Sequence, residues 1–241
     1  AMPPLAGTDP KAVLESAAGH TYRVKGEHED VSIRYDRLLS YADGSTKMIG
    51  VTVVTEQRDE PRSFTITSEE GQVVGNESNI SLTGDVRLAA SDGLRVRTER
   101  ATYAESDGMV RAEGPVEFSS GRLTGSGLGL TYEKNRDVLA ILERAVVHIA
   151  PDDKGAKGAE ISAGSATMER REKIIRFERT MRARRAAQRV EADAGVAHLS
   201  EDETRLETVE LRGNSRITGS MAGAGGLRAL TGRDIDLRYG P

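Results

Sequence analysis

The sequence predicts an all-β protein assembled from stacked antiparallel strands. Apolar and polar residues alternate along segments throughout the chain, and a period of two places one face of each segment inward and the other in water. Turn signatures containing Gly, Asp and Ser separate the segments. Aromatic residues make up only 4% of the 241 residues, which favours a thin sheet structure lined by small aliphatic side chains.

The alternation starts at Thr21 and is clearest between residues 79 and 132. Turns are expected at 42–45, 70–71, 91–93, 106–108 and 119–121. The inward positions of the clearest stretch are predicted to be Val86, Leu88, Leu94, Val96, Val116, Phe118, Leu128 and Leu130.

Two segments are less regular. Residues 1–20 are expected to form a linker and a short helix, with Asp9 as the N-cap and Pro10 as the first helical residue. Segment 169–194 is rich in Arg, Glu and Ala, which favour helix. Because Ile175 and Phe177 keep the period of two, we predict strands there instead.

An internal repeat organises the chain. One element recurs with its ends at Tyr103, Tyr132, Met168, His198 and Tyr239. A second element recurs between them, at residues 82–86, 112–116, 142–146, 177–181 and 211–215. Each repeat amounts to about two strands, and two strands cannot bury their own apolar face, so the copies are expected to stack.

The sequence lacks the constellations of an enzyme. It has no Cys, and its four His occur at no metal-ligand spacing. Thr124 replaces the first Gly of a nucleophile elbow around Ser126, and the glycines at 125–129 lack the helix of a dinucleotide site. We therefore predict no catalytic residue, no metal and no cofactor.

Nucleic acid is also an unfavourable partner, because the net charge is −4 and Phe177 is the only aromatic residue within the basic run 170–189. Two interpretations of this run stay open. It is either a solvated strand face or a contact for anionic lipid phosphates or an acidic partner.

Several stretches resemble known families. The segments 81–88, 93–103, 110–118 and 125–132 are similar in order and spacing to LptC, and residues 158–239 resemble the repeats of the OstA/LptA family. The resemblance implies an elongated antiparallel β-jellyroll with a V-shaped apolar groove. It divides the chain into a linker (1–20), an LptC-like jellyroll (21–150) and OstA/LptA-like repeats that continue it (151–241).

The resemblance also implies a role in the periplasm. An LptC-like protein receives lipopolysaccharide from an inner-membrane ABC transporter complex and passes it to an LptA-like protein, and it is anchored to the inner membrane by a helix that would precede this sequence. Further repeats of the same chain could replace the LptA-like partner. The eight inward residues above would then line the lipid groove.

The last predicted strand, 229–239, offers an unprotected edge. It contains no Pro and carries Ile235, Leu237 and Tyr239 at alternate positions, which we predict to be the partner edge. Proline at Ile235 or Leu237 is expected to abolish association there. The same edge supports the alternative function, a structural or adhesive β-solenoid that assembles by strand pairing.

Overall fold

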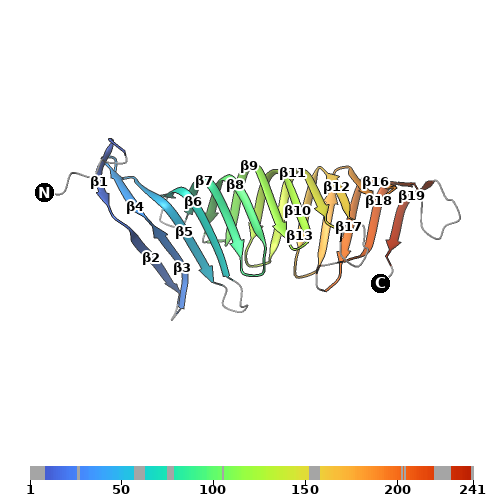
Figure 1. The fold of residues 1–241 in the computed structure, drawn as a ribbon, viewed down its shortest axis with the longest axis horizontal. Coiled ribbons are helices and arrows are strands. Elements are labelled where there is room, and N and C mark those ends of the chain that lie inside the picture. Colours follow the sequence, from blue (N-terminus) through green and yellow to red (C-terminus); the bar gives the residue numbers. More distant parts are fainter. Residues whose placement is uncertain are drawn as a thin grey trace. The chain divides into compact units, whose positions relative to one another are not determined.

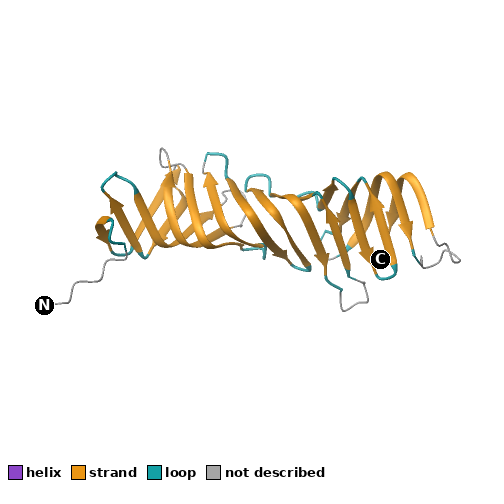
Figure 2. Cartoon of the chain, turned by 90° about the horizontal axis from the view of Figure 1, so that it is seen from above, coloured by secondary structure: helices purple, strands orange, loops and turns teal. Residues whose placement is uncertain are grey.

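The computed structural model describes residues 9–25, 28–56, 63–74, 79–104, 106–151, 158–201, 203, 205–219 and 229–239, without the side chains of 22–25, 28–30, 56 and 74. Every regular element in these residues is a β-strand, as Figure 2 shows. The all-β prediction is thereby confirmed. The predicted strands within 169–194 are also present.

The chain divides into two compact units, Ala1–Ser106 and Asp107–Pro241. Figure 1 labels their strands, numbered in chain order, where there is room. The strands of the first unit are β1 (Ala12–Ser16), β2 (Gly19–Lys25), β3 (His28–Tyr35), β4 (Arg37–Tyr41), β5 (Thr46–Glu56), β6 (Ser63–Val74), β7 (Asn79–Ala90) and β8 (Arg95–Ala104). Those of the second unit are β9 (Met109–Ser120), β10 (Leu123–Glu133), β11 (Val138–Ile149), β12 (Ala159–Ala163), β13 (Ser165–Glu169), β14 (Ile174–Glu178), β15 (Met181–Arg185), β16 (Gln188–Ala192), β17 (Ala194–Leu199), β18 (Leu206–Thr218) and β19 (Ala229–Arg238).

The second unit consists of two sheets that share their long strands. Strand β11 pairs through Val138–Ile141 with β13 and through Ala145–Ile149 with β12. Strand β18 divides in the same way between β17 and β16. We call the sheet that contains β13, β14 and β17 sheet I, and the sheet that contains β12, β15 and β16 sheet II. Both are antiparallel throughout.

The strands change sheet at corners, which coincide with the second repeated element of the sequence. Residues at these corners adopt the left-handed conformation: Gly84 and Asp85, Gly114, Arg144, Arg179 and Thr180, Gly213 and Asn214. In the second unit the corners stack through main-chain hydrogen bonds. Gly164 donates to the Arg179 carbonyl at 2.9 Å, Thr180 to Asp193 at 2.9 Å, and Asp193 to Gly213 at 2.8 Å. The repeat therefore encodes a column of bends.

The bend brings the two sheets face to face. Tyr239 donates its main-chain N–H to Glu207 at the start of β18, whereas Arg189, beside Arg185 in the β15–β16 hairpin, pairs with Thr218 at its end. An extended strand of the length of β18 would hold its ends about 40 Å apart. The Arg185 guanidinium nevertheless lies 4.5 Å from the centre of the Tyr239 ring. Such a contact requires that β18 folds back at its corner.

Corner glycines are expected to be sensitive to substitution. Gly213 has a φ of +71°, and a Cβ atom there would lie 2.4 Å from Asp193 Oδ2. We predict that Gly213→Ala lowers the free energy of unfolding by about 1–3 kcal/mol. Gly121→Ala is the control, because Gly121 has a φ of +55° but nothing within 4 Å of the added Cβ. Urea denaturation should show a smaller loss for the control, and equal losses would contradict the close approach.

The N-terminal helix prediction is wrong. Asp9 does accept a hydrogen bond from the main-chain N–H of Lys11, at 2.9 Å, and its pKa is lowered mainly by that bond and then by the Tyr41 hydroxyl. This arrangement is an Asx turn, which also resembles a helix cap in sequence. The chain then enters β1, which pairs with β4 instead of forming a helix.

Three further differences concern turns, the unit boundary and the repeat. The expected turn at 70–71 lies inside β6, where the register with β7 shifts between Thr67 and Glu70. The compact units divide after Ser106, whereas the sequence placed a boundary at 150/151; most of the loop predicted at 151–158 lies outside the described residues. The repeat position assigned to His198 points outward, and its neighbour Ala197 is the buried one.

Candidate functional site

The interior of the second unit is lined by rows of inward residues that cross its strands in direct register. One row in sheet I contains Ala112, Leu130, Ile141, Ala166, Phe177, Gly195, Leu211 and Ile235. A row in sheet II contains Phe118, Gly125, Val147, Ile161, Ala183, Val190, Ile217 and Leu230. Neither row is interrupted by a charged residue. The two sheets thus present facing apolar surfaces that run from β9 to β19.

The first unit contains a similar row. Ile33, Val53, Ile66, Leu88 and Val96 are paired in sequence across five strands. All except Ile33 are buried. The stacking of apolar residues across strands therefore extends to both units, each considered by itself.

The predicted inward residues are buried with one exception. The buried ones, with exposed fractions between 0% and 8%, are Val86, Leu88, Leu94, Val96, Val116, Phe118 and Leu130. Leu128 is half-buried. Strand β10 carries irregularities on both sides of Leu128, and Gly129 follows with a φ of +71°. The corner shifts the alternation by one residue, so Leu130, and not Leu128, keeps the inward phase.

Both phenylalanines in these rows have small neighbours. A Cβ atom on Gly125 would lie 2.1 Å from Cε1 of the Phe118 ring, which covers this glycine. Phe177 lies between Ala166 and Gly195 in its row. Small neighbours thus provide the room for each aromatic ring. The sequence signal for this pairing is a Gly or Ala opposite each Phe, and it becomes readable only when the register is known.

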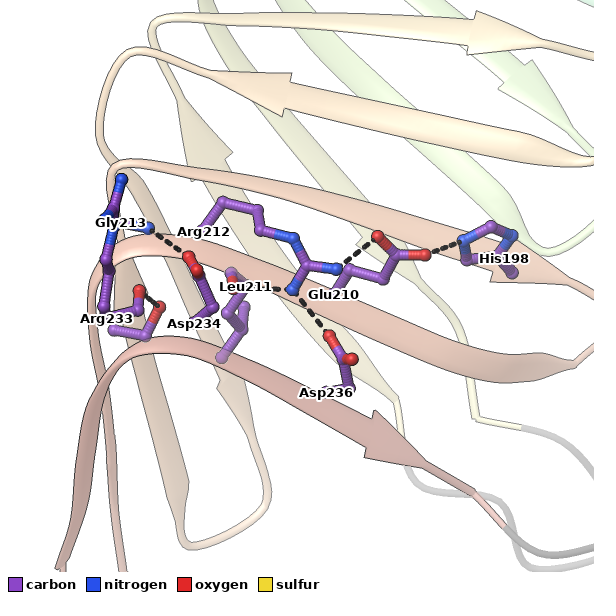
Figure 3. Close-up of polar contacts among 9 residues, drawn as sticks. His198, Glu210, Leu211, Arg212, Gly213, Arg233, Asp234 and Asp236 are labelled. Carbon is purple, nitrogen blue, oxygen red and sulfur yellow. Dashed lines mark hydrogen bonds and ion pairs between the residues drawn. The ribbon is translucent and has the colours of Figure 1, made fainter.

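Strand β19 is the last strand of the second unit, and no described strand pairs with its other edge. A polar network on the outer face holds it to β18, as Figure 3 shows. Arg212 of β18 donates to Asp236 of β19 at 2.5 Å and to Glu210 at 2.6 Å, and Glu210 also bonds His198 at 2.9 Å. The hydrogen bond with Asp236 raises the pKa of Arg212.

The residues predicted as the partner edge face the other way. Tyr239 donates its main-chain N–H to β18, and alternate residues of a strand share that direction, so Leu237 and Ile235 also bond to β18. Their side chains are half-buried on the inward face. The main-chain groups at the open edge therefore belong to Asp234, Asp236 and Arg238. The period of two identified the strand but not which edge of it was open.

The first half of the basic run makes internal contacts. Arg170 is 7% exposed, and its guanidinium lies 3.3 Å from Glu203 and 4.0 Å from Asp137. Lys173 also reaches Glu203, at 3.3 Å. These bonds join three turns, after β10, β13 and β17, at one rim of sheet I. These contacts could not be predicted from the sequence, because the residues that form them come from three separate turns.

Two more cations of the run are paired as well. Arg176 bonds Glu169 at 2.7 Å on the outer face of sheet I. Arg179 donates to the carbonyl oxygens of Gly164 and Leu142 at the corner column. Most of the first half of the run is therefore structural.

Part of the chain matches a known family. Residues 36–150 match the family model of LptC, described as lipopolysaccharide-assembly, LptC-related. The matched residues run from β4 to the end of β11 and leave β12 to β19 outside the match. Residues 36–150 are therefore similar to LptC, and they make up slightly less than half of the 241 residues.

A solved structure is also similar to part of this chain. The crystal structure of LptH from Pseudomonas aeruginosa, the LptA homologous periplasmic component of the lipopolysaccharide transport device, is 13% identical in sequence. The alignment covers 62% of this chain and 96% of LptH, with a TM-score of 0.43. No curated protein matches the sequence.

None of the described elements is a helix long and apolar enough to cross a membrane. Within the same residues, no group of three or more His, Cys, Asp or Glu side chains is arranged to hold a metal ion.

Proposed function

We propose that this protein is a periplasmic lipid-bridge protein that carries lipopolysaccharide from an inner-membrane ABC transporter complex toward the outer membrane. The observation that carries the proposal is the continuity of the apolar rows, together with the LptC match over residues 36–150. Acyl chains gain about 0.8 kcal/mol for each CH₂ group removed from water. A surface that is apolar across successive strands lets a chain move from one rung to the next without a large barrier.

We place the lipid in the interior because both of its walls carry uninterrupted rows of apolar residues. Sheets I and II are joined covalently at the corners, and the described turns at their other ends include 134–137 in sheet I and 186–187 in sheet II. A lipid would enter between these turns, with its acyl chains against Leu130, Ile141 and Val147. The proposed role requires no bond-making, and we propose no catalytic residue or cofactor.

The proposal includes the remaining partners that the sequence implies. An LptA-like protein or further repeats of the same chain would pair with the open edge of β19, and a helix preceding the sequence would anchor the protein to the inner membrane. A structural or adhesive β-solenoid is the second candidate. The specific observation in its favour is the same unpaired edge.

Photo-crosslinking tests the lipid role. A small diazirine side chain at Leu130, which is inward and 1% exposed, should crosslink to lipopolysaccharide. The same group at Thr131, the outward neighbour, should not. A second matched pair is Leu88 (inward) and Arg87 (outward) in β7. Crosslinks from Thr131 and Arg87 alone would contradict the interior site and favour the solenoid.

A further inference from the structure

The second half of the basic run contains two arginines that face each other and have no counter-ion among the described residues. Arg184 of β15 lies directly opposite Arg189 of β16, so their Cβ atoms are about 5 Å apart on the same face. Both side chains are exposed. Among the described residues, no carboxylate lies within ion-pair distance of either guanidinium. Like charges in direct cross-strand register are destabilising unless an anion compensates them.

The nearby acidic side chains contact other residues. Glu160 lies opposite Arg184 on β12, but its carboxylate is 3.6 Å from His148. Glu191 is 4.0 Å from Arg182 on the other side of the hairpin. One further exposed cation, Arg216, lies opposite Glu191 on β18. The outer face of sheet II therefore carries a local excess of positive charge around residues 184 and 189.

The first unit contains a similar cross-strand arginine pair, whose positive charge is compensated by a carboxylate. Arg87 of β7 lies directly opposite Arg97 of β8. Asp85 accepts from both guanidinium groups, at 2.5 Å from Arg87 and 2.9 Å from Arg97. The pKa of Asp85 is lowered, chiefly by the bond from Arg87. The arginine pair of the first unit thus holds one acidic group between its two members, whereas the pair 184/189 has no such group in the part of the chain that the structure describes.

The uncompensated pair lies beside the mouth of the interior. Arg184 and Arg189 flank the hairpin turn at 186–187, at the free end of sheet II. Arg185, between them in sequence, has the opposite phase and shares the inward side with the buried Met181. Its guanidinium reaches across to the Tyr239 ring, 4.5 Å from the ring centre. An anion bound by residues 184 and 189 would therefore stand at the rim, next to the opening between the sheets.

We infer that Arg184 and Arg189 form a phosphate site that binds the phosphorylated head group of the lipid whose acyl chains occupy the interior. This inference rests on the proposed function. Guanidinium groups bind phosphate oxygens through paired, charge-assisted hydrogen bonds, and two of them in register can take one phosphate. The position at the rim matches an amphipathic ligand, which keeps its charged head in water while its chains are buried.

Binding of defined lipids tests the inference. The probes are lipid A with both phosphates and the same lipid after chemical dephosphorylation, in matched detergent, measured by fluorescence anisotropy. The variant is R184Q/R189Q, and the control is R87Q/R97Q, which removes the cross-strand pair that already has its own acid. We expect R184Q/R189Q to weaken binding of the phosphorylated lipid by about tenfold or more and to leave the dephosphorylated lipid unaffected. The control should change neither affinity.

Three other results would contradict the inference, and one of them would also contradict the proposed function. If the parent protein binds the two lipids equally, the phosphate site is overturned while the lipid-bridge function stands. If it binds neither lipid, the proposed function itself fails, and the inference fails with it. A third arm uses inorganic phosphate as competitor. Displacement of lipid by low millimolar phosphate would show a site for the free ion and overturn the assignment to a lipid head group.

Discussion

Phe177→Ala is expected to lower the free energy of unfolding by about 3–5 kcal/mol, the largest stability loss predicted for a single substitution in this protein. Phe177 is 1% exposed and lies at the middle of the sheet I row. Its row neighbours are Ala166, which carries only a methyl group, and Gly195, which has no side chain. Neither can fill the cavity that the ring would leave. Denaturant titration followed by far-ultraviolet circular dichroism measures the loss.

Val196→Ala provides the matched control for this cavity. Val196 lies one residue from Gly195 on β17 but has the outward phase and is half-buried. Its truncation should cost less than about 1 kcal/mol. A loss for Phe177→Ala no greater than that of the control would show that the two sheets do not pack on each other around this ring.

Arg238→Pro is expected to weaken pairing of β19 with a partner strand by about tenfold to a hundredfold, because Pro removes a main-chain donor at the open edge and leaves the partner's carbonyl without its hydrogen bond, at a cost of about 1–3 kcal/mol. The N–H of Arg238 faces away from β18, so the strand itself should stay in place. Sedimentation at several concentrations, alone and with an LptA-like protein, measures the association.

Two further variants separate edge pairing from loss of the strand. Arg238→Ala keeps the donor and should associate like the parent protein. Leu237→Pro removes a donor that bonds to β18, so it should detach β19 and raise hydrogen exchange along it. If Arg238→Pro associates as tightly as the parent, β19 is not the contact edge. If the parent stays monomeric and binds no partner, the open-edge proposal is wrong.

Much of the fold could be predicted because strand alternation is a local property. The phase of Val86, Leu88 and Val96 follows from a period of two that needs no knowledge of the partner strand. The repeat was also detectable, since its copies recur in the same order. The strands of segment 169–194 were predictable for the same reason, although residue propensities there favour helix.

Predictions from the sequence were wrong where one local pattern is compatible with two structures. Asp9 followed by Pro10 can cap a helix or close an Asx turn, and pairing with β4 decided for the turn and the strand β1. Leu128 shares its parity with Leu130, but the corner at Gly129 separates them: the buried residues are Leu123 and Gly125 before the corner and Leu130 after it. A shift of one residue reverses every side chain beyond it, so register errors appear only when the bulges are known.

By itself, then, the sequence determined the strand content, the apolar faces and the stacking of repeats, because each depends on neighbours within a few residues. The tertiary structure alone decided which strand edge is open, since the direction of each N–H group depends on pairing with β18. The tertiary structure also decided which arginines of the basic run have internal partners and which, Arg184 and Arg189, have no counter-ion among the described residues. Arg170 meets Glu203 through the packing of two turns, and Arg184 meets Arg189 through the register of two strands, so neither contact exists before the chain has folded.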